Sequence, residues 1–305
     1  MTISGKTQLL GLLGWPVAHS LSPAMHNAAA AALGLDVVYV PLPVRPEDVS
    51  TAVAALPALG FLGANVTVPH KQAVVPFLAE LEPGAKAIGA VNTIVVKQST
   101  SNSEQSTPNN LQSPVSNLPA LTGHNTDWTG FLADLAELGV EVNGRDCLIL
   151  GAGGSARAVA YALAQAGGRV QVLARRSAQA QALVEAIGPH LPRPLAGWLN
   201  AWPLGELATA VAHTTAPLIV NTTPVGMSPN QDASPWPVDV TFPPDAFVYD
   251  LIYNPPTTSL MRQAQAAGCR TANGLGMLLW QGAQAFTLWT GRTPDTAVMR
   301  AALGM

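Results

Sequence analysis

The segment RDCLILGAGGSARAVAYALAQAGGRVQVLARRS, residues 145–177, decides the fold. An apolar run from Cys147 to Leu150 leads into the pattern G-x-G-x-x-A at residues 151–156, and an alanine-rich run follows. A strand that passes through such glycines into a helix is typical of a dinucleotide-binding unit, because the backbone can approach a pyrophosphate whose charge the helix N-terminus stabilises. A glycine turn in an α/β protein that binds no nucleotide is the alternative. The order of strand, glycines and helix favours the nucleotide site.

The next expected strand, RVQVLA at residues 169–174, indicates which dinucleotide binds. An NAD-binding unit usually carries an acidic residue at the end of this strand, where it accepts from the ribose 2'-hydroxyl. No acidic residue occurs from Cys147 to Val184, and the strand is followed by two arginines, whose guanidinium groups can hold a 2'-phosphate. The sequence therefore predicts NADP. The expected cofactor residues are Gly151, Ala152, Gly153, Gly154, Ser155, Ala174, Arg175 and Arg176.

The composition limits the classes of protein that need to be considered. The chain has 305 residues, 48% hydrophobic and 11% charged, which is enough for about two domains with buried cores. The net charge is -3 and the lysines and arginines form no cluster, which argues against a nucleic-acid partner. Cys147 and Cys269 lie far apart in apolar surroundings, which indicates reduced core thiols rather than a disulfide or a metal site.

The N-terminal apolar run gives no sign of a targeting segment. It is broken by Gly11, Gly14 and Pro16 and lacks a clear cleavage site. No other apolar run is long enough to cross a bilayer. We therefore expect a cytoplasmic protein that has no membrane segment and no metal.

Short apolar runs alternate with alanine-rich runs in two blocks, which residues 98–121 separate. This alternation predicts an α/β fold made of βαβ units around mainly parallel sheets. Residues 98–121 are dominated by Ser, Thr, Asn, Gln and Pro, which predicts a flexible insertion too polar to pack. The last segments, 274–291 and 295–305, predict two amphipathic helices, with Trp280 and Trp289 filling the core.

Polar side chains lie at the ends of apolar runs, where α/β sheets usually bind ligands. Asn92 in GAVNT and Asp127 in NTD are two of them, and Asp127 fits a helix cap as well as a catalytic group. Lys71 is a third, and it follows Pro69, which suits the first turn of a helix. We expect a helix to begin here, and its dipole opposes a nearby cation. The ordinary interpretation is that the long stem of Lys71 lets the ammonium group reach water.

Small polar residues of the first block recur at a spacing of two. Ser20 and Ser22 form one pair, and Asn65 and Thr67 form another. In an extended segment the two members of each pair face the same way. Such neutral donors suit a small polyhydroxylated acid, although Ser22 could equally cap a helix.

The chain resembles the shikimate dehydrogenase family in eight short segments that follow the family's order. They are SLSPAMHN, GANVTVPHK, GAVNT, NTD, GAGGSAR, NTTPVGM, YN and NGLGMLLWQGA, and the resemblance covers nearly the whole chain apart from residues 98–121. It implies a substrate-binding and catalytic domain formed by residues 1–125 with about 277–305. It also implies a Rossmann-type NADP-binding domain, residues 126–276, with C-terminal helices that return to the first domain. The implied reaction is the reversible reduction of 3-dehydroshikimate to shikimate by NADPH, on the way to chorismate and the aromatic amino acids.

The resemblance also implies roles for single residues, with Lys71 and Asp127 as the catalytic pair. The substrate carboxylate would be held by Ser20, Ser22 and Tyr253, and the hydroxyls by Thr67, Asn92 and Gln281 with Lys71 and Asp127. Leu251 and Gly274 would lie near the nicotinamide, and Arg175 would hold the 2'-phosphate. Hydride delivery to a ketone builds negative charge on oxygen, which an ammonium group can stabilise and protonate. A helix start and partial desolvation would ease proton release from Lys71, and Asp127 would orient it.

The chain departs from the family's usual pattern at three places. His124 and Trp128 flank NTD where the family often has an acidic or small residue and a glycine, and Trp128 is expected to narrow the substrate cleft. Residues 174–176 are Ala-Arg-Arg where Asn-Arg-Thr is usual, which keeps the arginine and changes the adenine side. The insertion stands where the family has a short hairpin, and we expect it to be dispensable.

Three other functions are weighed against this one. A quinate or shikimate dehydrogenase with relaxed cofactor choice is disfavoured by the two serines and by the missing acidic residue. A non-catalytic ligand sensor need not keep Lys71 together with Asp127. A methyltransferase that binds S-adenosylmethionine usually needs an acidic residue after the second strand. We expect small-molecule partners, no nucleic acid and no membrane, and a homodimer is left open.

Overall fold

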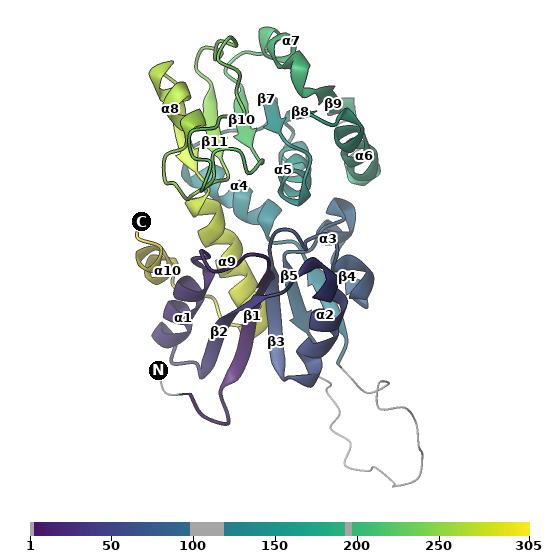
Figure 1. Ribbon diagram of the computed structural model, residues 1–305, viewed down its shortest axis with the longest axis vertical. Coiled ribbons are helices and arrows are strands. Elements are labelled where there is room, and N and C mark those ends of the chain that lie inside the picture. Colours follow the sequence, from purple (N-terminus) through teal and green to yellow (C-terminus); the bar gives the residue numbers. More distant parts are fainter. Residues whose placement is uncertain (1–2, 98–118, 193–196) are drawn as a thin grey trace. The chain divides into compact units, whose positions relative to one another are not determined.

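The computed structural model describes residues 3–97, 119–192 and 197–305, which form two compact units (Figure 1). The first unit contains Met1–Lys86, Ala90–Asn125 and Ala285–Gly304, and the second contains Ala87–Gly89 and Thr126–Gln284. The long helix α9 (Leu275–Thr290) contributes its first part to the second unit and its end, from Ala285, to the first. Each unit is built around one sheet.

A mixed sheet forms the centre of the first unit. Its strands are β1 (Gln8–Gly14), β2 (Val37–Pro43), β3 (Phe61–Val66), β4 (Glu80–Leu81), β5 (Thr93–Val96) and β6 (Leu121–His124), and their order across the sheet is β2-β1-β3-β5-β6-β4. The expected parallel pairing is confirmed for β1 with β2 and β3, whereas β5 runs antiparallel to β3 and β6. The helices of this part of the chain are α1 (Ser22–Ala32), α2 (Val49–Ala58), α3 (Pro83–Ile88) and α10 (Thr296–Ala302).

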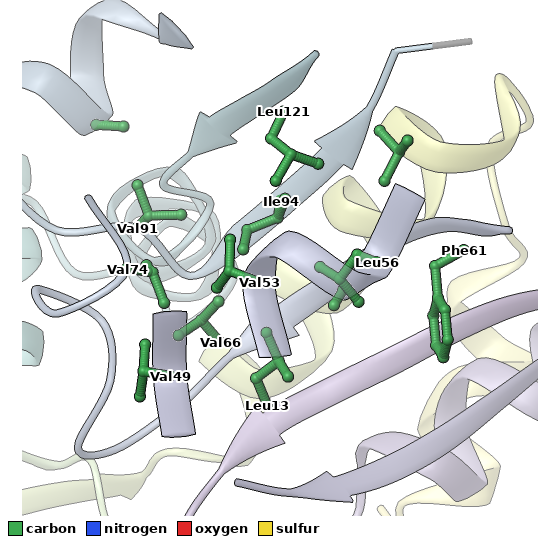
Figure 2. Packing of buried hydrophobic residues seen from close by; sticks show 13 residues of the cluster. Leu13, Val49, Val53, Leu56, Phe61, Val66, Val74, Val91, Ile94 and Leu121 are labelled. Carbon is green, nitrogen blue, oxygen red and sulfur yellow. The ribbon is translucent and has the colours of Figure 1, made fainter. Parts of the chain in front are cut away.

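The apolar core of the first unit includes one face of α2. Val49, Val53 and Leu56 lie on that face because spacings of four and three residues return to the same side of a helix. They belong to one cluster with the strand residues Leu13 and Ile94 (Figure 2), and all five side chains are at most 4% exposed. This packing holds β1 and β3 in place, and the loops after these strands carry most of the polar residues singled out in the first block.

A parallel sheet of the Rossmann type forms the centre of the second unit. Its strands are β7 (Asp146–Leu150), β8 (Arg169–Ala174), β9 (Leu199–Pro203), β10 (Leu218–Asn221), β11 (Phe247–Asp250) and β12 (Arg270–Asn273). Its helices, besides α9, are α4 (Asp127–Glu137), α5 (Gly154–Gln165), α6 (Ser177–Ile187), α7 (Leu207–Ala212) and α8 (Ser259–Ala266). The strand order β12-β11-β10-β7-β8-β9 reverses between β7 and β10, and α/β sheets bind ligands at the carboxyl ends of strands at such a switch point. The glycine pattern follows β7 directly and therefore lies at this point.

Two sequence predictions about packing need correction. The expected insertion ends at residue 121, but Leu121 begins β6 and is only 7% exposed, because it packs in the core of the first unit. Residues 119 and 120 belong to no helix or strand, and the rest of that prediction, residues 98–118, lies outside the described residues. Trp280 is only half-buried and its indole N–H donates to Glu137 Oε2 at 2.9 Å, so it is not a core side chain. Trp289 is buried as predicted, and its N–H donates to the Ile94 carbonyl at 2.9 Å.

Three predictions concern the cysteines, membrane-spanning helices and metal ligands. Cys147 and Cys269 are buried free thiols, as predicted. Within the three described ranges, no helix combines the length and apolar character needed to cross a membrane. The same residues contain no group of three or more His, Cys, Asp or Glu side chains that could hold a metal ion.

Candidate active site

The glycine loop joins β7 to α5 and leaves room for a ligand beside its backbone. Gly151 has φ +113°, in the region that favours glycine, and a Cβ there would lie 2.6 Å from Thr222 Oγ1. A Cβ on Gly153 would meet nothing within 4 Å. The first bond of α5 runs from the Arg157 N–H to the Gly153 carbonyl, so the helix begins within the glycine pattern. A helix N-terminus next to an open glycine backbone fits a pyrophosphate, and these residues can therefore hold a dinucleotide.

The end of β8 lies beside the start of this loop. The Gly151 N–H donates to the Leu173 carbonyl at 2.8 Å, and the chain then passes through the buried Ala174 to Arg175 and Arg176. Both arginines are exposed, and their side chains make no hydrogen bond or ion pair with the rest of the described chain. Two cations that need no partner within the protein are suited to a phosphate group.

Leu251 and Gly274, which the resemblance assigns to the nicotinamide, are brought together by the structure. A Cβ on Gly274 would collide with the Leu251 carbonyl oxygen, so only glycine allows the two segments to approach this closely. The Leu251 N–H donates to the Asn221 carbonyl at 3.0 Å. The pair therefore lies at the carboxyl ends of β10, β11 and β12, in the same unit as the glycine loop.

A buried carboxylate holds the segment that follows β11, and sequence reasoning missed it. Asp250 is 0% exposed; its Oδ1 accepts from Asn221 Nδ2 at 2.9 Å and from the Ile252 N–H at 3.1 Å, and its Oδ2 accepts from Thr258 Oγ1 at 2.7 Å. Burial raises the pKa of Asp250 to about 6, and the three donors limit the rise. An acidic residue at the end of an otherwise apolar strand was the available signal. The segment it fixes carries Leu251 and Tyr253, and burial also raises the pKa of Tyr253.

Asp127 is the first residue of α4 rather than its cap. The capping position is Thr126, whose side chain makes no capping bond, and the Asp127 side chain is 4% exposed. A carboxylate in the first turn is favoured by the helix dipole. One turn later, a Cβ on Gly130 would lie 2.6 Å from the Gln281 backbone nitrogen, so α4 and α9 touch there. Asp127 and Gln281 thus lie on two helices in direct contact, and Gln281 Nε2 donates to the Leu278 carbonyl at 2.8 Å.

Trp128, one of the departures from the family pattern, has a packing partner on α5. Its ring meets the ring of Tyr161 edge-on, with 5.3 Å between the centroids and 86° between the planes. Such aromatic pairs contribute beyond the area they bury. The contact fixes the first turn of α4 against α5, and the narrowing of the cleft by Trp128 stays a prediction.

No helix begins at Pro69, so the prediction of a helix dipole beside Lys71 is wrong. The chain forms turns from residue 68 to residue 74, and only a short 3-10 helix, Val75–Phe77, follows. The turns are held by tertiary contacts instead: His70 Nε2 lies 2.7 Å from the Val44 carbonyl, and the Lys71 carbonyl accepts from the Val91 N–H at 2.7 Å. Lys71 is half-buried, and the bond from Val91 ties its backbone to the residue that precedes Asn92.

The two serines do not form an extended pair. Leu21 between them has the helical values φ -85° and ψ -10°, and the Ser22 N–H donates to Ser20 Oγ at 3.2 Å. Ser22 is the first residue of α1, whose capping position is Leu21, so the cap interpretation of Ser22 is also wrong. Both serines nevertheless lie at one place, where the loop after β1 meets the start of α1.

Asn65 differs from the other polar residues of the first block because its side-chain amide is hydrogen-bonded to other residues of the protein. Its Oδ1 accepts from the Tyr39 hydroxyl at 2.8 Å, and its Nδ2 donates to the Asn92 carbonyl and to Thr93 Oγ1, both at 3.1 Å. Both amide protons are thereby used, so Asn65 is not the ligand donor expected from its spacing with Thr67. Thr67 follows the end of β3, and its N–H donates to the Leu13 carbonyl at 2.8 Å.

The predicted site residues fall into two groups, one in each unit. The first unit holds Ser20, Ser22, Thr67, Lys71 and Asn92. The second holds the glycine loop, Ala174, Arg175, Arg176, Leu251, Gly274, Asp127, Tyr253 and Gln281. The first group offers hydroxyl, amide and ammonium donors to a small polar acid, and the second offers a phosphate-binding loop and a buried carboxylate.

Known proteins share both the sequence and the fold of this chain. Two family profiles match, described as "Shikimate dehydrogenase substrate binding domain" over residues 12–94 and "Shikimate 5'-dehydrogenase C-terminal domain" over residues 274–303. A protein of Moorella thermoacetica named shikimate dehydrogenase (NADP(+)) is 46% identical over 299 residues, which are 97% of this chain and 92% of the relative. The crystal structure of shikimate 5-dehydrogenase from Thermus thermophilus, in complex with NADP(H) and shikimate, is 38% identical with a TM-score of 0.78 and covers 97% of this chain and 98% of its own. Quinate dehydrogenase from Corynebacterium glutamicum, in complex with NAD, is 33% identical with a TM-score of 0.80, over 98% and 99% of the two chains.

Proposed function

The chain belongs to the shikimate dehydrogenase family and is an NADP-dependent oxidoreductase acting on a CH–OH group, and from this premise we propose how its residues divide the reaction. The reaction is the reversible reduction of 3-dehydroshikimate to shikimate by NADPH, a step towards chorismate and the aromatic amino acids. We assign substrate binding and catalysis to residues 1–125 with about 277–305, and NADP binding to residues 126–276, which also supply Asp127 and Tyr253. The match of residues 12–94 to a substrate-binding profile and the glycine loop of the second unit support this division.

NADP, when bound, supplies the chemistry of hydride transfer. The backbone of Gly151, Ala152, Gly153, Gly154 and Ser155 holds its pyrophosphate, and Arg175 holds the 2'-phosphate through charge-assisted hydrogen bonds. Ala174 and Arg176 flank that arginine, and Leu251 with Gly274 forms the surface near the nicotinamide. Two observations support these roles: Leu251 approaches Gly274 closely, and no atom lies within 4 Å of a Cβ placed on Gly153.

Lys71 and Asp127 carry the proton transfer in this proposal. The Lys71 ammonium group donates a proton to the oxygen that becomes negative during ketone reduction, and in the reverse direction the neutral Lys71 amine accepts that proton. Asp127 orients the ammonium group. The substrate carboxylate is held by Ser20, Ser22 and Tyr253, and the hydroxyls are held by Thr67, Asn92 and Gln281 together with the catalytic pair.

One observation carries the proposal: residues 90–92 are bonded on one side to Lys71 and on the other to the chain just before Asp127. The Val91 N–H donates to the Lys71 carbonyl at 2.7 Å. The Ala90 carbonyl accepts from Asn125 Nδ2 at 2.8 Å, and the Asn92 N–H donates to the His124 carbonyl at 3.1 Å. These bonds lie within the first unit, so GAVNT is fixed between two segments that supply one predicted catalytic residue each.

The test is shikimate-dependent formation of NADPH by the purified chain and two variants. Lys71→Ala and Asp127→Asn should each lower kcat about 10²- to 10⁴-fold, the usual contribution of a positioned acid or base. NADP binding, followed by calorimetry, should stay within twofold of the wild-type value. Lys97→Ala, which removes an exposed lysine paired with Glu80, is the matched control and should keep full turnover. Near-normal turnover in either site variant would remove that residue from the pair.

A second substrate and cofactor must be measured in the same assay, because a quinate dehydrogenase with NAD shares this fold at a TM-score of 0.80. The exposed Arg175 and Arg176, and the absence of an acidic residue from Cys147 to Val184, favour NADP. We expect shikimate with NADP to give the highest kcat/KM of the four combinations. A higher value for quinate with NAD would reassign the chain.

Compartment and assembly are further proposals. We place the protein in the cytoplasm, which is supported by two buried free thiols. A homodimer is tested by light scattering, where the mass of two chains would support it and the mass of one chain would exclude it.

A further inference from the structure

The hydroxyl of Tyr39 is buried in the first unit and held in one place. The side chain is 2% exposed, and its ring stacks on His26 with 4.4 Å between the centroids. Its backbone is fixed by Asn27, whose Oδ1 accepts from the Tyr39 N–H at 2.8 Å and whose Nδ2 donates to the Tyr39 carbonyl at 2.9 Å. Burial lowers the pKa of His26 to about 3, so the stacking partner is neutral at physiological pH. A hydroxyl with so little freedom can set the orientation of its neighbours.

Tyr39 is linked to Asn92 through Asn65. The phenol donates to Asn65 Oδ1 at 2.8 Å, and the same amide donates to the Asn92 carbonyl and to Thr93 Oγ1. Thr93 Oγ1 in turn donates to Asn92 Oδ1 at 3.1 Å. Because an amide nitrogen can only donate, the Asn65 oxygen must accept, and the proton in the first bond therefore belongs to Tyr39. The chain of bonds fixes which end of the Asn92 amide points to Thr93.

The phenol of Tyr39 keeps its proton. Burial raises the pKa of Tyr39 well above its ordinary value, so the hydroxyl remains a donor to Asn65 Oδ1. Tyr39 is therefore connected through Asn65 to Asn92, which the proposed function assigns to the hydroxyls of the substrate.

We propose that Tyr39 is a positioning residue, which aligns Asn92 for shikimate through Asn65 without touching the substrate itself. This inference rests on the proposed function, because it concerns one of the binding residues assigned there. It assigns Asn65 to the same supporting role. Neither residue is expected to affect the cofactor, whose predicted ligands lie in the second unit.

Tyr39→Phe keeps the ring and removes only the hydroxyl. The KM for shikimate should rise about five- to tenfold, as expected for the loss of one buried hydrogen bond and the freed amide it leaves. kcat and the KM for NADP should stay within twofold, because the loss falls on ground-state and transition-state binding alike. Tyr249→Phe is the matched control, since it also removes a buried hydroxyl, which donates to Asp134 in the second unit. Its KM for shikimate should equal that of the wild-type chain.

Two further measurements, made below the melting temperature of each variant, distinguish the positioning role of Tyr39 from a purely structural one. Asn65→Ala combined with Tyr39→Phe should raise the KM no more than Asn65→Ala alone, because both changes break the same chain of bonds. Additive effects, or an unchanged KM in Tyr39→Phe, would overturn the proposal. Calorimetric measurement of shikimate binding distinguishes a failure of the proposed function from a failure of the role proposed for Tyr39. A wild-type chain that binds shikimate without turnover refutes the proposed catalysis and leaves Tyr39 testable by affinity, whereas a wild-type chain that binds no shikimate overturns both.

Discussion

Asp250→Asn should change how the stability of the protein depends on pH. The carboxyl group is fully buried, and its pKa rises from the ordinary 3.8 to about 6, which corresponds to about 3 kcal/mol between the two protonation states. Because the folded state binds this proton more tightly than the unfolded chain, the stability it contributes is complete below the ordinary pKa and is lost as the pH rises through about 6. The asparagine variant carries no charge at any pH and escapes this loss.

The expected result concerns the difference between two free energies of unfolding. From pH 4 to pH 7.5, the free energy of unfolding of Asp250→Asn minus that of the wild-type chain should increase by about 2 kcal/mol, because part of the wild-type loss already occurs below pH 4. A constant penalty of about 1–3 kcal/mol is expected at all pH values, because the new amide nitrogen faces the Thr258 hydroxyl, which loses its acceptor. The difference should therefore start negative at pH 4 and climb across this range.

Urea unfolding followed by circular dichroism, repeated at half-unit steps of pH, measures both free energies with their slopes. Asp232→Asn, on an exposed turn, controls for the general effect of removing one acidic residue. A difference that stays flat from pH 4 to pH 7.5, or that falls, would refute the reasoning. It would mean that the Asn221, Ile252 and Thr258 donors stabilise the charged carboxylate enough to cancel its burial.

Two further changes test the packing and the cofactor assignment. Gly130→Ala places a methyl group 2.6 Å from the Gln281 backbone nitrogen and 2.8 Å from its Cβ, so α4 and α9 must separate, at a cost of about 1–3 kcal/mol. Thermal unfolding should show the loss, Gly205→Ala with nothing within 4 Å should not, and equal melting temperatures for the two would contradict the close approach. Arg175→Ala should weaken NADPH about 10- to 100-fold by fluorescence titration, as expected for lost bonds to a charged group, and should leave NADH nearly unchanged. Equal losses for both cofactors would undo the 2'-phosphate assignment.

What the sequence predicts correctly is local along the chain. The strand, the glycines and the helix of residues 147–165 adjoin one another, so their order alone indicates the loop. Arg175 follows β8 directly, and register with β7 places it near that loop. The two C-terminal helices are visible in the spacing of their apolar residues.

What the sequence does not predict depends on contacts between distant segments. Pro69 permits a helix start, but the bond between His70 and Val44 and the bond between Lys71 and Val91 shape the chain into turns. Asn65 and Asp250 look like ligand and strand-end residues until their partners are known. The partners of Asn65 lie 26–28 residues away in the chain, and Asn221, one partner of Asp250, lies 29 residues away. Spacing along one segment carries no information about them.

The two hydrogen bonds between Asn27 and the Tyr39 backbone also determine whether the outer edge of β2 can pair with another strand. β2 is the outermost strand of its sheet and pairs only with β1 on its inner side, where the Val44 N–H continues the ladder to the Gly14 carbonyl. Because backbone groups alternate between the two sides of a strand, positions 39, 41 and 43 point outward. Asn27 occupies both groups of Tyr39, and Pro41 and Pro43 have no N–H to offer. This edge is closed to strand addition along those positions, so a second copy of the chain, or an aggregate, has to begin elsewhere.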